Sequence, residues 1–167
     1  MADFCRMFGM SWRDKMQILV VDDEKVCLLA FVEELQRELP QAQIDSYRSG
    51  EEAWKAAQET HYDMVFTDIT MNGMSGVELA NRIHEKDPDI PIYFETGETP
   101  GEVQKRGLQT ERCLFKPVLH GDVGELLDKK DTLPPFEISL PVKESETEEP
   151  YQKKPPGFLD RWLMKKK

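Results

Sequence analysis

The sequence predicts an α/β fold in which a doubly wound parallel sheet carries helices on both faces. From Met16 onward, short apolar runs alternate with segments whose apolar residues recur at helical spacing, and few turn residues separate them. Most of the runs expected to form strands are continuously apolar, which is typical of strands covered on both faces. At 167 residues the chain is long enough for one such domain and too short for two of typical size.

The first half of the chain alternates three expected strands with two expected helices. Leucine and valine recur at helical spacing in the first helix, which stops before Pro40. Ser49 and Glu52 predict a capping box at the start of the second helix. The strand before that helix alternates weakly and is expected at the sheet edge. In chain order the five segments are Gln17–Val21, Lys25–Leu39, Ala42–Tyr47, Ala53–Gln58 and Met64–Thr67.

The second half alternates three expected helices with two expected strands. Ser75 and Glu78 predict another capping box at the start of the third helix. The fourth helix begins after Thr99 with proline at its first position, and Gly107 should end it within about two turns. We therefore expect it to be short and labile. The strands are expected at Ile90–Glu95 and Cys113–Phe115, and the last helix at Leu119–Lys130.

Carboxylates stand where two of the apolar runs end. Asp22 and Asp23 follow the first run, and Asp68 follows the run that ends at Thr67. If the two strands are neighbours, the three carboxylates converge at one edge of the sheet, within reach of solvent. Like charges crowded in this way are costly unless a cation lies among them, and oxygen ligands favour a hard divalent ion. The sequence therefore predicts a Mg2+ site.

Two further polar residues follow apolar runs and complete the set. Thr96 comes after Ile90–Glu95, and Lys116 comes after the run at 112–115. A metal-bound carboxylate nucleophile, an ammonium charge and a hydroxyl donor are the parts needed to accept a phosphoryl group onto Asp68. The positive charges would stabilise the oxygens of the transferred group.

Four pieces of the sequence occur in an order and spacing typical of a known family. They are Val20–Glu24, Asp68–Gly76, Thr96–Gly97 and Lys116–Pro117, spread over residues 15–130. Through them the chain resembles the receiver domain of two-component response regulators. The resemblance implies a flavodoxin-like five-stranded sheet of order 2-1-3-4-5. It also implies a phosphoacceptor rather than a true enzyme, phosphorylated by a sensor histidine kinase or a histidine phosphotransfer protein.

The resemblance also implies a role for each matching position. Asp68 would be the phosphoacceptor, Thr96 the switch hydroxyl, and Lys116 the lysine that contacts the phosphoryl group. The implied Mg2+ ligands are Asp22, Asp23, Asp68 and the backbone carbonyl of Thr70.

Two positions depart from the family's pattern. Asn72 stands where a loop proline is common, a change expected to alter loop stiffness more than chemistry. Cys113 stands where the family has an aromatic residue that swings inward when the threonine moves. A thiol has neither the bulk nor the hydroxyl of tyrosine. The family's usual coupling between the threonine and an aromatic side chain therefore lacks its aromatic residue. We expect a buried packing role for Cys113 rather than a redox role.

Composition limits the classes of partner and compartment. The formal net charge is -10, with the acidic excess inside residues 15–130, and such a surface disfavours nucleic-acid binding. Cys5, Cys27 and Cys113 are odd in number and lack metal-ligand spacing, as expected for reduced cytosolic thiols. The N-terminal stretch lacks the apolar core of a signal peptide, and no run approaches a membrane span. A cytoplasmic protein is expected.

Four other polar side chains are expected to take no part in this chemistry. Glu24 should complement the dipole at the start of the first helix rather than bind metal. His61, His84 and His120 have no partner at catalytic spacing, so no role is assigned to them.

We expect three parts in the chain: an N-terminal extension at 1–14, the receiver domain at 15–130 and a tail at 131–167 rich in proline and charge. Within the tail, Phe136–Leu140 should either add a strand or pack locally. The amphipathic end Gly157–Lys167 needs a surface to lie on, which favours a protein partner or the domain itself. One short basic segment is a weak anchor, which argues against membrane binding. The sequence leaves the oligomeric state open.

Three functions are compatible with these residues to different degrees. The first is a stand-alone phosphoacceptor that switches binding to a downstream protein. The second is an interaction module that keeps the fold and signals through its tail without phosphorylation. The third, a phosphohydrolase of the haloacid dehalogenase type, fits poorly because that family carries a DxD motif after its first strand, whereas Asp22 and Asp23 are adjacent.

Overall fold

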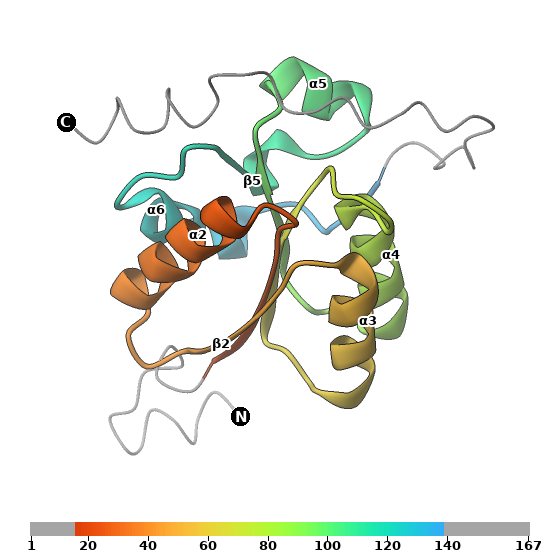
Figure 1. The fold of residues 1–167 in the computed structure, drawn as a ribbon. Helices are drawn as coiled ribbons and strands as arrows, with labels where there is room; N and C mark the ends of the chain where they lie inside the picture. Colours follow the sequence, from red (N-terminus) through yellow and green to blue (C-terminus); the bar gives the residue numbers. More distant parts are fainter. Residues whose placement is uncertain (1–15, 139–167) are drawn as a thin grey trace.

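A computed structural model describes residues 16–138 and shows five parallel strands in the order β2-β1-β3-β4-β5 (Figure 1). This confirms the predicted fold class and strand order. The N-terminal extension and the amphipathic end of the tail lie outside the described residues. The strands are β1 (Gln17–Val21), β2 (Gln43–Tyr47), β3 (Met64–Asp68), β4 (Ile92–Thr96) and β5 (Cys113–Phe115).

Helices cover both faces of the sheet. Figure 1 shows α2 and α6 on one face and α3 and α4 on the other. Each face has its own apolar core, one centred on Phe31 and Phe66 and the other on Leu79 and Phe94. The helices are α2 (Lys25–Glu38), α3 (Gly50–Glu59), α4 (Gly76–Lys86), α5 (Pro100–Lys105) and α6 (Asp122–Asp128), with short 3-10 helices η2 (Thr110–Arg112) and η3 (Lys130–Thr132).

Burial follows the position of each strand in the sheet. Every residue of the central strands β3 and β4 is buried, whereas no residue of β2 is fully buried. The weak alternation of apolar and polar residues in the second strand therefore correctly predicted an edge strand.

The helix ends agree with the capping signals, with two corrections. Ser49, Ser75 and Thr99 each accept a hydrogen bond from the backbone N–H three residues on. Among the described helices, only the one after Thr99 also has the reciprocal glutamate bond of a full capping box. The last helix is shorter than predicted, because Gly121 has a φ of 93° just before α6 begins. A left-handed residue cannot continue an α-helix, so the segment from Leu119 stays outside it.

The first residues beyond the last helix pack on the sheet. Phe136 is 8% exposed and its ring lies 5.1 Å from the His84 ring and 6.2 Å from the Phe94 ring, centroid to centroid. Arg112 donates a hydrogen bond to the carbonyl of Pro134. Of the two alternatives for Phe136–Leu140, the described part, through Ile138, packs locally and forms no strand.

None of the helices in residues 16–138 is both long and apolar enough to cross a membrane.

Candidate functional site

The ends of β1 and β3 bring three carboxylates together. The two strands are neighbours, with Val21 paired to Thr67, so Asp22 and Asp68 leave the sheet side by side. Carboxylate oxygens of Asp22, Asp23 and Asp68 all lie within 4.8 Å of one another. The convergence expected from the sequence is therefore present.

Lys116 lies among these carboxylates. Its Nζ donates hydrogen bonds to Asp22 Oδ2 and, at 2.9 Å, to Asp68 Oδ2, and its side chain is 2% exposed. Burial alone would lower the pKa of Lys116, but the carboxylates of Glu95, Asp68 and Asp22 raise it well above its usual value. The lysine is a fixed positive charge in the pocket.

One ammonium does not fully compensate this group of carboxylates. Burial raises the pKa of Asp22 despite the opposing charge of Lys116. Asp23 Oδ1 is buried and has no hydrogen-bond partner within the described structure. A buried oxygen without a partner is costly. An all-oxygen donor set with one uncompensated atom fits Mg2+, so Asp22, Asp23 and Asp68 are suited to hold it.

Asn72 contacts the other oxygen of Asp23. Its backbone N–H and its side-chain Nδ2 both donate to Asp23 Oδ2, at 3.1 and 2.7 Å. A proline at this position would supply neither bond. We expected Asn72 to affect loop stiffness more than chemistry, whereas the structure places it against a candidate metal ligand.

Asp68 is more enclosed than the sequence suggested. Its side chain is 2% exposed, and the Thr70 N–H donates to Asp68 Oδ1 at 3.3 Å. We expected this carboxylate to lie within reach of solvent, so that expectation was wrong for this conformation. The loop after Asp68 folds tightly against its strand: a Cβ at Gly76 would lie 1.7 Å from the Asp68 carbonyl oxygen, which is why only glycine fits there.

Thr96 is the last residue of β4, next to Glu95, which pairs with Asp68 across the sheet. It is 1% exposed, and its Oγ1 accepts a hydrogen bond from the Glu98 N–H at 3.1 Å. The Thr96 carbonyl accepts from the Lys116 N–H at 2.7 Å. The two sequence-predicted residues are thus held together through the backbone.

A side-chain bridge lies beside the pocket. Glu98 accepts hydrogen bonds from Thr70 Oγ1 and from the Arg106 guanidinium, each at 2.8 Å. Arg106 follows the short helix α5 and carried no sequence signal, because nothing local marks one exposed arginine as a partner of a residue eight positions earlier. The described structure gives no contact for the Thr70 carbonyl that would test its predicted role.

Two cysteines lie within the described residues. Cys113 is 8% exposed, and burial raises the pKa of its thiol to about 12, as expected for a packing role. Cys27 is also a free thiol.

Glu24 precedes α2 as expected, and its carboxylate accepts a hydrogen bond from the Cys27 thiol at 3.1 Å. His120 is an exposed loop histidine, as expected, but no sequence pattern indicated that its Nδ1 faces two carboxylates of α2.

Comparisons with known proteins agree with this architecture. Residues 18–128 match the model of the response regulator receiver domain. The solved structure of response regulator TrrA from Thermotoga maritima, in complex with Mg(2+)-BeF, is 34% identical with a TM-score of 0.55, covering 70% of this chain and 97% of that one. The Vibrio cholerae chemotaxis protein CheY4 has a TM-score of 0.58 at 23% identity, covers 69% of this chain and 98% of that one, and shows the shared fold.

Curated relatives are longer than the matched segment. The sensor protein EvgS of Escherichia coli is 30% identical over 107 residues, which is 63% of this chain and 9% of that protein. The transcriptional regulatory protein ResD of Bacillus subtilis is 34% identical over 110 residues, which is 65% of this chain and 45% of that protein. The chain thus spans less than half the length of either relative. By its matched residues and its fold, it belongs to the response regulator receiver domain family.

Proposed function

We propose that this receiver domain accepts a phosphoryl group onto Asp68 from a phosphohistidine donor and thereby switches its binding to other proteins. The observation that best supports the proposal is the position of Lys116, buried between Asp22 and Asp68. A buried ammonium that contacts a strand-end carboxylate is placed to stabilise charge on a group transferred to that carboxylate.

The chemistry requires a nucleophile, a fixed positive charge and alignment. A carboxylate oxygen of Asp68 attacks phosphorus, and the bond to the donor's imidazole nitrogen breaks. That nitrogen keeps the electron pair, and a donor ring that is already protonated on its other nitrogen leaves as a neutral imidazole. Bound by Asp22, Asp23, Asp68 and the Thr70 carbonyl, Mg2+ would supply positive charge against the phosphoryl oxygens. Lys116 adds a second positive charge, and the Thr96 hydroxyl donates to the new group.

The pocket must open before a donor can reach Asp68, because the side chain is 2% exposed. Contacts that differ between the free and the modified carboxylate can then shift the population between two conformations. Thr96 and Lys116 are the residues proposed to make the additional contacts.

The donor would be a sensor histidine kinase or a histidine phosphotransfer protein, and the output a downstream protein. Relatives named as sensor proteins, such as EvgS, support the first part. Residues 15–130 would be the phosphoaccepting domain, with Phe136 packed on it, and the tail at 131–167 would supply further contacts. Its setting would be the cytoplasm, and its catalysis would be limited to its own phosphorylation and dephosphorylation.

Incubation of the full chain with Mg2+ and acetyl phosphate, followed by intact mass measurement, tests this function. We expect a gain of one phosphoryl group, which Asp68→Asn abolishes and which removal of Mg2+ prevents. Asp63→Asn is the matched control, because Asp63 precedes the opposite end of the same strand. Equal labelling of wild type and Asp68→Asn would overturn the proposal.

A second candidate is an interaction module that signals without phosphorylation. The enclosure of Asp68 and the presence of a buried thiol at Cys113 favour it. It predicts that a protein partner binds equally well with and without beryllofluoride, which mimics the phosphoryl group on the aspartate. A change in partner affinity on adding beryllofluoride and Mg2+ would exclude it.

A further inference from the structure

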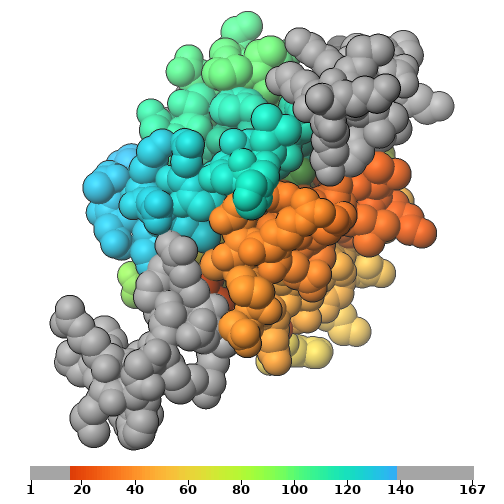
Figure 2. All heavy atoms as spheres, turned by 90° about the vertical axis from the view of Figure 1, so that its left-hand side faces the viewer, coloured from red at the N-terminus to blue at the C-terminus, as the bar shows by residue number. Residues whose placement is uncertain are grey.

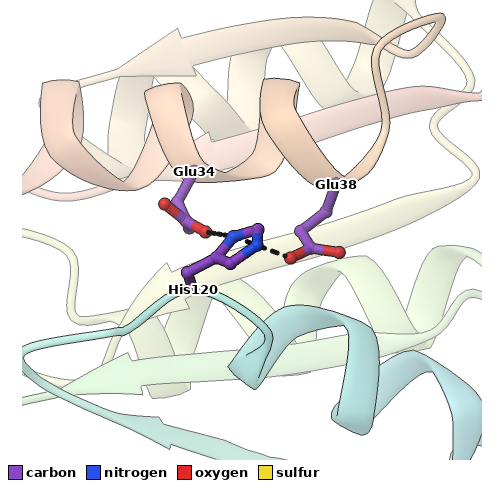
Figure 3. Close-up of side chains that lie close together, drawn as sticks. All are labelled: Glu34, Glu38 and His120. Carbon is purple, nitrogen blue, oxygen red and sulfur yellow. Dashed lines mark hydrogen bonds and ion pairs between the residues drawn. The ribbon is translucent and has the colours of Figure 1, made fainter.

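A second group of metal-ligating side chains lies on the α2 and α6 face of the sheet, outside the phosphoacceptor pocket. Glu34 and Glu38 are one helical turn apart on α2, and His120 lies in the loop between β5 and α6 (Figure 3). These two parts of the chain adjoin on the face shown in Figure 2. Oxygen and nitrogen atoms of the three side chains all lie within 4.8 Å of one another.

We propose that Glu34, Glu38 and His120 form a Zn2+ site that ties α2 to the loop before α6. One imidazole and two carboxylates are ligands that Zn2+ takes in proteins, with water completing the coordination. The imidazole distinguishes this group from the all-oxygen pocket at Asp68, which suits Mg2+.

The separations between the donor atoms fit a shared ion. His120 Nδ1 lies 2.9 Å from Glu34 Oε1 and 3.2 Å from Glu38 Oε1. Two ligand atoms bound to the same Zn2+ lie about 3.0–3.4 Å apart, for bonds of roughly 2.1 Å and angles between octahedral and tetrahedral. The side chains therefore need only small shifts to place all three donor atoms around one ion.

The surroundings orient the two carboxylates. Arg37 contacts Glu34 Oε2 at 3.3 Å and leaves Oε1 facing the imidazole. The Gly121 N–H donates to Glu38 Oε1 at 3.1 Å. A Cβ at position 124 would lie 3.2 Å from Glu38 Oε2, so the glycine there leaves room for this carboxylate. Hydrogen bonds of this kind fix the direction of metal ligands.

The burial of Glu34 distinguishes the group from an ordinary surface ion pair. The Glu34 side chain is 9% exposed, whereas that of His120 is 78% exposed. Burying a carboxylate is costly unless a cation compensates it, and an exposed imidazole or the half-exposed Arg37 compensates it only weakly. A divalent ion that enters from the exposed His120 side and binds Glu34 would compensate the charge of this buried carboxylate.

The test is calorimetric titration of Zn2+ into the full chain, with excess Mg2+ occupying the aspartate pocket and a non-chelating reductant keeping thiols reduced. We expect one Zn2+ per chain. His120→Ala and Glu38→Gln should each weaken binding by at least about tenfold. His61→Ala is the matched control, because His61 is also exposed and lies 3.8 Å from one carboxylate, that of Asp87.

Nitrogen-detected NMR of the imidazoles identifies the ligand atom, since the chain has three histidines. We expect Zn2+ to move the Nδ1 resonance of His120 and to leave those of His61 and His84 in place. Unaltered Zn2+ binding in His120→Ala, a shift confined to another histidine, or no saturable binding would each overturn the proposal. Circular dichroism of the variants checks that they are folded.

Discussion

Asn72 donates two hydrogen bonds to one carboxylate oxygen of Asp23, while the other oxygen of that carboxylate is buried without a hydrogen-bond partner. The contacted oxygen is thereby fixed, and the remaining one is available to a cation. A residue that departs from the family pattern thus sets the direction of a candidate metal ligand.

Asn72→Ala should weaken Mg2+ binding by about tenfold, because loss of a hydrogen bond that orients a ligand typically costs 10–100-fold in metal affinity. Isothermal titration with Mg2+ measures the effect. Asn81→Ala on α4 serves as the control and should bind as wild type does. An Asn72→Ala affinity equal to that of the control would show that Asp23 needs no such support.

Lys116→Met should lower the free energy of unfolding by about 3 kcal/mol without Mg2+, because it leaves buried carboxylates without their ammonium partner. Added Mg2+ should then stabilise the variant more than it stabilises the wild type, since the ion replaces a lost positive charge. Urea unfolding with and without Mg2+ measures both effects.

The control for Lys116→Met is Lys129→Met, because the Lys129 side chain is 66% exposed. An exposed lysine contributes little, so the stability should barely change. Equal stabilisation by Mg2+ in Lys116→Met and wild type would count against a shared pocket for the lysine and the ion.

Arg106→Ala should raise the initial rate of phosphorylation by acetyl phosphate. Arg106 and Glu98 form an ion pair beside Thr70, and their side chains are 48% and 19% exposed. Such a pair stabilises the closed pocket by up to about 1 kcal/mol. Its loss should therefore raise the rate of phosphorylation by up to roughly fivefold. Time-resolved intact mass measurement gives the rate. Lys105→Ala, at the end of the same helix, should leave it unchanged.

Cys113 should react slowly with thiol reagents at pH 8 in the folded protein. Burial raises the pKa of this thiol from 9.0 to about 12, so the reactive thiolate is scarce. Peptide mapping after timed alkylation should show labelling of Cys113 at least about a hundredfold slower than in urea. Fast labelling of Cys113 in the native protein would instead support a redox role.

The raised pKa of Cys113 makes the stability of the fold decrease as the pH rises. The folded state keeps the Cys113 proton at pH values where the unfolded chain has lost it, so the folded state binds more protons. This contribution is complete below pH 9.0 and declines between 9.0 and about 12. Cys113→Ala should therefore show a shallower loss of stability over that range in alkaline urea titrations.

Phe136→Ala should lower the free energy of unfolding by about 3 kcal/mol, the lower end for a buried phenylalanine, because the ring packs against His84 and Phe94 at the margin of the core. Glu137→Ala, at an exposed neighbour, is the control and should change stability little. Urea unfolding of both variants decides whether the segment after η3 is part of the stable domain.

Much of the site was predictable because its residues are marked by local pattern. Asp22, Asp68 and Lys116 directly follow short apolar runs, and Thr96 ends another. Periodicity locates such strand ends, and the carboxyl ends of parallel strands meet at one edge of a sheet. The convergence of these side chains therefore follows from the sequence once the strands are taken as neighbours.

The sequence alone thus determined the α/β class, the strand ends and the set of polar groups at the pocket, because these depend on short-range periodicity. Only the tertiary structure decided the enclosure of Asp68, the Asn72–Asp23 bonds, the bridge from Arg106 to Glu98 and the meeting of His120 with α2. These contacts join side chains brought together by loop paths and helix packing. No local pattern encodes such distances, since each depends on how separate elements pack on the sheet.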